Sequence, residues 1–278
     1  MKKAVVFYGS MRELEMGSKS WHILGEDVDY FAVTWGDVVN NHQTDAGGTS
    51  SHPCDLSNFP VPIVKSVTPN FAEYSQSLTN LGLPNDSLIY ILYHWSLISL
   101  LSGIHTYDQI IIARTDMFCS NMFDSKWEPD IRPGKVTFSG MNDCVNDWIV
   151  TTDPAGLATL YDMYHNGISS RDFLNEFGEL KVIHYYLFEK TQANPEKFHY
   201  GEEANVFMAM PPSVLVRPNY PKAWLKLPHG PVLAYLLTRH AHEYELSLQN
   251  STDSADEITM NLLRCTEFKD SILTSFEG

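Results

Sequence analysis

A continuous run of β-branched and aromatic residues near the start of the chain constrains the fold more than any other feature. Residues 3–8 are Lys-Ala-Val-Val-Phe-Tyr, and Gly9 ends the run. A segment that is apolar without alternation is typical of a strand buried on both faces within a parallel sheet. The polar stretch of residues 11–24 predicts a helix directly after it. We therefore expect the fold to begin with a buried strand that feeds a helix.

The same alternation of strand-like and helix-like segments continues along the chain. Further strands are predicted over residues 28–34, 107–113, 136–139, 148–151 and 214–217. Helices are predicted over residues 69–81, 176–190, 229–248 and 256–276. Two more are predicted, one from a cap at Asn85 to residue 103 and one that starts at Asp153 and Pro154. Residues 40–62 are predicted to form a long loop. This order indicates an α/β fold of the Rossmann-like type, with a mostly parallel sheet flanked by helices.

A single domain over residues 1–278 is predicted from this pattern, because no linker or repeat interrupts it. Residues 1–190 carry the alternation and are expected to form the α/β core. Residues 191–278 are expected to form a mainly helical extension.

The composition excludes several classes of protein. At 278 residues and 44% hydrophobic content, the chain can bury a core without metal or disulfide support. Its 19 Lys and Arg against 34 Asp and Glu give a formal net charge of -15, which disfavours nucleic acid as a partner. No stretch has the roughly 18 apolar residues of a membrane span. A cytoplasmic protein is predicted, and its four cysteines (Cys54, Cys119, Cys144 and Cys265) have the spacing of neither a zinc knuckle nor a disulfide framework.

Two short motifs stand where the predicted strands end. Gly9, Ser10 and Arg12 follow the first strand, where a glycine permits a tight turn and an arginine can hold a phosphate bidentately. The later glycines of a dinucleotide fingerprint and the Gly-Lys-Ser/Thr of a phosphate-binding loop are absent. Equally, Gly9 could simply end the strand while Arg12 faces solvent.

The second motif is Arg114-Thr115-Asp116, which follows the isoleucine strand. In open α/β sheets, ligands bind at the carboxyl ends of the strands. An arginine and a carboxylate placed there could hold a diphosphate and the divalent cation that neutralises it. The alternative is a local ion pair between Arg114 and Asp116 that closes the strand.

The order and spacing of several motifs resemble a loosely related set of glycosyltransferases of the GT-A fold, which use nucleotide sugars and occur in bacterial polysaccharide clusters and phages. The similarity covers roughly residues 2–187. The motifs that carry it are Gly-x-x-Arg at residues 9–12, Asp-x-Phe-x-x-x-Trp at residues 29–35, Tyr-Asp-x-x-Ile-x-x-Arg-x-Asp at residues 107–116, residues 142–148, and residues 177–180.

This resemblance implies roles for individual residues on the donor side. Asp116 would bind a divalent cation, Mn²⁺ or Mg²⁺, as the last carboxylate of an Asp-x-Asp motif whose first carboxylate is replaced here by Arg114. Arg12 and Arg114 would then contact the diphosphate, with Trp35 on the nucleoside side. The positive charge at position 114 could neutralise part of the diphosphate charge that the cation would otherwise neutralise.

If the mechanism is inverting, a carboxylate must deprotonate the acceptor hydroxyl, and the resemblance offers Asp147 and Glu179. Asp147 is favoured because it abuts a short predicted strand near the presumed edge of the sheet. As structural alternatives, Asp147 could cap a turn and Glu179 could occupy the first turn of a helix.

Histidines give weaker signals. His199 and His229 are predicted in late loops, where GT-A enzymes often place a final metal or phosphate contact. His184 is five residues after Glu179, so the two side chains do not share a helical face as a chelating pair would.

The expected activity is therefore transfer of a sugar from a nucleotide-sugar donor to a hydroxyl acceptor. The acceptor would be a glycan or, less favoured by the net charge, a modified DNA base. Two alternatives stay open at this point. One is a sugar nucleotidyltransferase, although Met11, Glu13 and Leu14 replace the usual glycine-rich loop and its lysine. The other is a non-catalytic relative that binds carbohydrate or protein, and the absence of the first carboxylate of the metal motif favours it.

Overall fold

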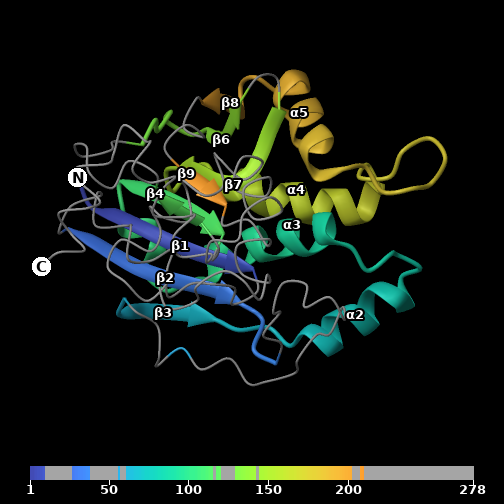
Figure 1. Cartoon of the computed structure of the whole chain (residues 1–278), viewed down its shortest axis with the longest axis horizontal. Helices are drawn as coiled ribbons and strands as arrows, with labels where there is room; N and C mark the ends of the chain where they lie inside the picture. The colour runs from blue at the N-terminus through green and yellow to red at the C-terminus, as the bar shows by residue number, and fades with distance from the viewer. Residues whose placement is uncertain are drawn as a thin grey trace, which may run out of the picture.

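A computed structural model of the chain describes residues 1–9, 27–37, 56, 61–114, 117–119, 129–141, 144–201 and 207–209. Its centre is a seven-stranded sheet in the order β3-β2-β1-β4-β7-β6-β8 (Figure 1). The strands are β1 (Lys3–Gly9), β2 (Val28–Thr34), β3 (Ile63–Val67), β4 (Gln109–Arg114), β6 (Val136–Met141), β7 (Cys144–Thr152) and β8 (Phe198–Gly201). A separate two-stranded sheet pairs β5 (Met117–Cys119) with β9 (Phe207–Ala209).

The seven-stranded sheet is mostly parallel. β1 pairs in parallel with β2 and β4, β2 pairs in parallel with β3, and β6 pairs in parallel with β8. Among its described strands, β7 alone runs the other way, between β4 and β6. The predicted α/β class, with a mostly parallel sheet flanked by helices, is confirmed.

Four described α-helices accompany the sheet and lie on the right of the view in Figure 1. They are α2 (Phe71–Asn80), α3 (Ser87–Leu97), α4 (Leu157–Ser170) and α5 (Ile183–Ala193), with short 3-10 turns at Ile98–Leu100 and Ile104–Thr106. α3 packs against α4 and against β1 and β2, while α5 packs against β7. In the described ranges, no helix has both the length and the apolar character needed to cross a membrane.

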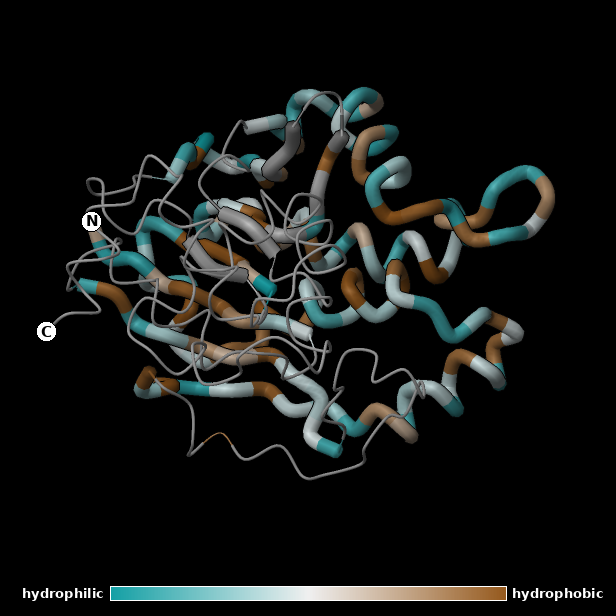
Figure 2. The backbone as a smooth tube through the Cα atoms, viewed as in Figure 1, coloured by the Kyte–Doolittle hydropathy of each residue, from teal (hydrophilic) through white to brown (hydrophobic). Residues whose placement is uncertain are grey.

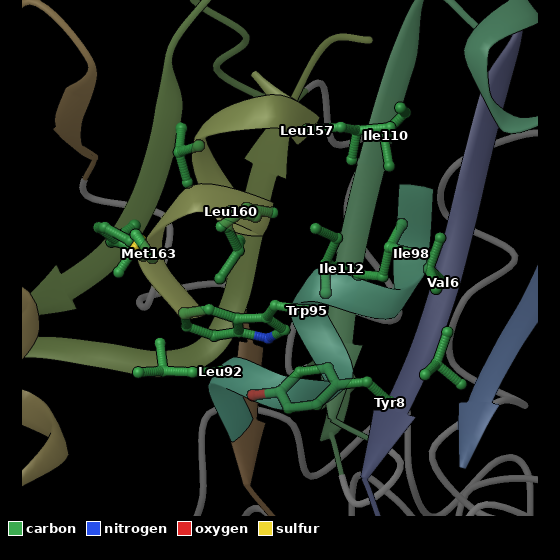
Figure 3. Close-up of a cluster of buried hydrophobic side chains, with 14 of the residues drawn as sticks. Val6, Tyr8, Leu92, Trp95, Ile98, Ile110, Ile112, Leu157, Leu160 and Met163 are labelled. Carbon is green, nitrogen blue, oxygen red and sulfur yellow. The ribbon is translucent and has the colours of Figure 1, made fainter. Parts of the chain in front are cut away.

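The main core fills the space between the sheet and helices α3 and α4. Alternate residues of β1 (Ala4, Val6 and Tyr8) face it, and Figure 3 shows Val6 and Tyr8 among side chains from α3, β4 and α4. The intervening β1 residues Val5 and Phe7 are also fully buried. Burial on both faces explains the continuous apolar run in the sequence, and Figure 2 shows hydrophobic residues concentrated along the central strands.

Three predicted helix starts differ from the structure. Asp86, rather than Asn85, caps α3, because its side chain accepts a hydrogen bond from the Leu88 amide at 2.8 Å. α4 begins at Leu157 rather than at Pro154, because the Asp153 carboxylate accepts from the Gly156 amide and closes a turn first. α5 begins at Ile183 and not at residue 176, since the preceding residues form a hairpin-like loop with a bridge between residues 174 and 180.

Some elements carry no clear signal in the sequence. β3 lies at one edge of the sheet, where Ile63 and Val67 are half-buried and Val64, Lys65 and Ser66 are exposed. β8 supplies the other edge, so the α/β core continues past the predicted boundary at residue 190 to at least Gly201. The helices predicted over residues 11–24, 229–248 and 256–276, and the strand over residues 214–217, lie outside the described residues.

A cluster of aromatic rings joins the end of β2 to the helices. Trp35 contacts Phe71, Tyr74, Tyr90, Tyr93 and His94 in this cluster. His94, in α3, lies edge-on to Trp35 with 4.3 Å between ring centroids. Its Nδ1 bonds the Tyr90 carbonyl at 2.8 Å, whereas the buried Nε2 has no hydrogen-bond partner among the described residues. Burial lowers the pKa of His94 to about 4.

This histidine makes stability depend on pH. Between its ordinary pKa of 6.5 and about 4, the unfolded chain binds a proton that the folded chain excludes. Its contribution is therefore fully present above pH 6.5 and is lost as the pH falls toward 4. As the pH falls from 6.5 to 4, the free energy of unfolding should decrease by about 3 kcal/mol more in the parent than in His94→Asn. Urea denaturation at each pH measures this difference.

The matched control is His165→Asn, because His165 is exposed on α4. Its free energy of unfolding should follow the pH dependence of the parent throughout. Parallel curves for the parent and His94→Asn would show that His94 does not set the acid sensitivity.

Candidate functional site

Neighbouring strands end together at the carboxyl edge of the sheet. The register aligns Gly9 with Thr34 across β1 and β2, and Tyr8 with Arg114 across β1 and β4. The chain builds β2 and β3 on one side of β1 and then returns to place β4 on the other side. The gap between β1 and β4 is thus the topological switch point, where open α/β sheets bind their ligands.

Gly9 turns the backbone at this point. Its φ of +96° lies in the left-handed region, which side-chain-bearing residues rarely adopt. A Cβ atom here would meet nothing within 4 Å, so the requirement for glycine comes from the backbone conformation and not from crowding. The tight turn directly after the first strand stays a prediction, because the residues that follow Gly9 lie outside the described residues.

Asp147 reaches the same edge through a bulge in β7. Val145 of β7 pairs with Gly140 of β6, whereas the next pair joins Val150 to Phe138, so β7 carries extra residues between the two pairs. Regular pairing with β4 begins at Ile149, opposite Ala113. Asp147 therefore lies within β7, an interior strand between β4 and β6, and does not lie beside a border strand of the sheet as predicted. Bulges of this kind commonly re-aim side chains beside functional sites.

Three strands contribute to one polar cluster, which we call the Arg114–Asp147–Tyr8 cluster. The Tyr8 hydroxyl of β1 donates to the main-chain oxygen of Asp147 and lies 3.4 Å from its Oδ2. The Arg114 Nη1 of β4 lies 3.5 Å from the same Oδ2. The buried carboxylate thus lies beside the Tyr8 hydroxyl and a guanidinium, and the guanidinium supplies the opposite charge that a buried anion needs.

The two charged side chains of the cluster differ in access to solvent. The Asp147 side chain is 4% exposed, whereas the Arg114 side chain is 22% exposed. A ligand approaching the switch point would therefore meet the guanidinium before the carboxylate. In this arrangement Asp147 can orient the guanidinium from its buried side, while the exposed part of the guanidinium can contact an anion. Proton transfer to Asp147 requires that its carboxylate be uncovered.

Trp35, predicted on the nucleoside side, follows β2 and is 3% exposed. Its indole packs in the aromatic cluster described above, with Phe71, Tyr74, Tyr90, Tyr93 and His94. Asp37, two residues later, accepts hydrogen bonds from the amides of Phe71 and Ala72 and so ties the end of β2 to the start of α2. Trp35 has a clear packing role, and its contact with a nucleoside stays a prediction.

Glu179, the second predicted base, is exposed on the loop between α4 and α5, which projects at the right of Figure 1. Its amide donates to Asn175 Oδ1 at 2.9 Å, and the Asn175 amide donates to the Glu179 carbonyl at 2.7 Å. The loop precedes α5, so Glu179 does not occupy the first turn of a helix. No hydrogen bond or ion pair within the described ranges joins its carboxylate to the Arg114–Asp147–Tyr8 cluster.

Several predicted residues lie outside the described residues, namely Ser10, Arg12, Asp116 and His229. His199 lies in β8 and not in a loop, with its Nε2 3.3 Å from Asp130 Oδ2. Within the described part of the chain, no group of three or more His, Cys, Asp or Glu side chains could hold a metal ion. The role of Asp116 as a ligand of a divalent cation therefore stays a prediction.

Tyr8 is the member of the cluster that sequence reasoning missed. At 1% exposure it alternates with Ala4 and Val6 on the core face, so it has the pattern of a core residue. One signal could have pointed to it: its hydroxyl must find a partner at the end of a buried strand, next to a glycine. The bulge had a signal too, in the polar pair Asn146-Asp147 between apolar neighbours.

Comparisons with known proteins add little to this site. No protein-family model and no curated protein matches the chain. Solved structures similar to it include the glycosyltransferase GlyE of Streptococcus pneumoniae TIGR4, at a TM-score of 0.41 and 9% identity for the apo form, over 73% of this chain and 46% of that one. A second GlyE structure gives a TM-score of 0.41 and 10% identity, over 74% of this chain and 46% of that one. The chain thus spans less than half the length of these structures.

The cluster predicts a measurable stability effect. Tyr8→Phe removes the hydroxyl that bonds Asp147 and leaves a buried acceptor without this donor, so we expect a loss of about 1–3 kcal/mol in the free energy of unfolding. Urea denaturation at neutral pH measures it. Tyr161→Phe is the control, since that ring is 43% exposed and its hydroxyl should contribute little. Equal stability of both variants would place the Tyr8 hydroxyl outside the interactions that hold the site.

Proposed function

We propose that this chain is a glycosyltransferase that moves a sugar from a nucleotide-sugar donor to a hydroxyl acceptor. The observation that carries the proposal is the Arg114–Asp147–Tyr8 cluster at the switch point, where β1 ends at Gly9 with a left-handed φ. It presents a partly exposed guanidinium where an α/β sheet of this type binds its ligand. The motif order described above, which resembles nucleotide-sugar-dependent enzymes, supports the same assignment.

The chemistry needs charge stabilisation at this edge. In glycosyl transfer the bond between the anomeric carbon and the diphosphate oxygen breaks, and a bond to the acceptor oxygen forms. Negative charge builds on the departing nucleoside diphosphate, and preorganised donors lower the barrier by stabilising it. Arg114 would act on the outer phosphate together with Arg12. Asp116 would hold the divalent cation, which supplies further positive charge, and Trp35 would lie on the nucleoside side.

The acceptor hydroxyl must lose a proton as it attacks. The proposed base is Asp147, whose buried carboxylate would have to be uncovered in the complex with donor and acceptor, and Glu179 is the second candidate. The acceptor itself is proposed to be a glycan, free or linked to lipid. A modified DNA base is the less favoured acceptor, because a net charge of -15 repels a phosphate backbone.

Titration calorimetry tests the function directly. Nucleoside diphosphates and a panel of nucleotide sugars are titrated into the full chain, with and without Mn²⁺. A glycosyltransferase binds a nucleoside diphosphate and slowly hydrolyses the matching nucleotide sugar. A sugar nucleotidyltransferase prefers a nucleoside triphosphate with a sugar phosphate, and a carbohydrate- or protein-binding relative responds to none of these ligands.

The role of Arg114 gives a sharper prediction. Arg114→Ala should weaken the binding of a nucleoside diphosphate about 10- to 100-fold, and that of a nucleoside monophosphate much less, because the guanidinium is proposed to contact the outer phosphate. Arg114→Lys keeps a charge opposite Asp147 but loses the bidentate fork, so its affinity should be intermediate.

Arg132→Ala is the matched control, because Arg132 is exposed and paired with Asp130. It should bind both ligands as the parent does. Equal losses for the mono- and diphosphate in Arg114→Ala, with thermal melting confirming the fold, would make Arg114 a structural residue.

The base is tested by donor hydrolysis, in which water replaces the acceptor. Asp147→Asn should lose about 10²- to 10⁴-fold in the rate of donor hydrolysis, while Glu179→Gln should lose much less. The opposite pattern would move the base to Glu179. An Asp147→Asn protein with parental hydrolysis and an intact circular dichroism spectrum would defeat the assignment of Asp147.

A further inference from the structure

His184 connects the first turn of α5 to the strand that carries Asp147. Its Nδ1 lies 2.9 Å from the main-chain oxygen of Val145. Because a carbonyl oxygen only accepts, Nδ1 must carry the proton in this contact. The His184 side chain is half-buried, whereas the next residue, Tyr185, is exposed. The imidazole is therefore turned toward the sheet by the same helix turn that leaves Tyr185 in solvent.

Val145 is the last residue of β7 that pairs with β6 before the bulge. It pairs with Gly140 of β6, and its side chain is buried in the main core. From Val145 the chain leaves regular pairing with β6, passes Asp147, and meets β4 at Ile149. The hydrogen bond from His184 thus holds the backbone on the near side of the bulge, two residues before the carboxylate that faces Arg114.

The other side of the same segment is held by Tyr8, whose hydroxyl donates to the main-chain oxygen of Asp147. A bulge lacks part of the ladder of hydrogen bonds that fixes a regular strand, so its conformation depends on such contacts from outside the strand. β1 supplies one of them and α5 supplies the other.

We propose that His184 is a positioning residue, which acts through Nδ1 on the Val145 carbonyl to keep Asp147 beneath Arg114. Its effect on rate rests on the proposed function, whereas its effect on the bulge does not. A small displacement of groups that act on the reacting atoms is enough to cost about 10²-fold in rate.

Three substitutions of His184 test which of its two ring nitrogens is needed. The amide nitrogen of His184→Asn can replace Nδ1, that of His184→Gln reaches the place of Nε2, and His184→Leu offers no donor. We expect donor hydrolysis in the Leu and Gln variants to fall about 10²-fold in kcat with little change in KM, and the Asn variant to stay within a few-fold of the parent.

Hydrogen exchange of the peptide that spans Cys144–Thr152 provides a readout independent of activity. It should be faster in the Leu and Gln variants and unchanged in the Asn variant. His165→Leu, on the exposed side of α4, is the control and should match the parent in both measurements.

Several results would overturn the proposal. One is a His184→Leu protein whose rates of donor hydrolysis and hydrogen exchange match those of the parent. Another is an active His184→Gln protein together with an inactive His184→Asn protein, because Nε2 and not Nδ1 would then be the nitrogen that acts. If His184→Leu fails to fold, the comparison of Asn with Gln decides. If the parent hydrolyses no nucleotide sugar, the proposed function fails, and the exchange data alone decide whether His184 holds the bulge.

Discussion

Parallel pairing of β1 with both β2 and β4 is the constraint on which the rest of the structure depends. β1 is buried from Ala4 to Tyr8, and its register brings Tyr8 opposite Arg114. A slip of one residue would turn Tyr8 to the other face of the sheet and withdraw its hydroxyl from Asp147. The core on one side of β1 and the polar cluster at its end are therefore set by the same pairing.

The strands that are buried without alternation could be predicted from the sequence. The strand predicted over residues 28–34 has the same bounds in the structure, and the isoleucine strand lies at the centre of the sheet. β3 escaped prediction because an edge strand with three exposed residues has little apolar signal. The start of α4 differs from its prediction because Asp153 bonds a nearby amide and closes a turn before the helix begins.

The candidate site could be predicted only in part, for a related reason. Arg114 follows a recognisable strand, so its place at the carboxyl edge could be predicted from local sequence. Its partner Asp147 depends on the bulge in β7, which lies between the pairing of Val145 with β6 and the pairing of Ile149 with β4. Tyr8 looked like a core residue because it is one, and only its hydroxyl belongs to the site. Local patterns predict where a strand ends, but not which distant side chains meet there.

The exposed side of β3 has a consequence for how the protein behaves in solution. A strand at the border of a sheet offers unpaired main-chain groups to any extended segment that approaches, and this is a common route to edge-to-edge association. β3 is only five residues long, and a lysine stands at its centre among the exposed residues Val64, Lys65 and Ser66. A second copy that paired antiparallel with β3 in the register centred on Lys65 would bring two Lys65 ammonium groups opposite each other, which is unfavourable. The short, charged strand therefore disfavours the addition of a further strand at this border of the sheet.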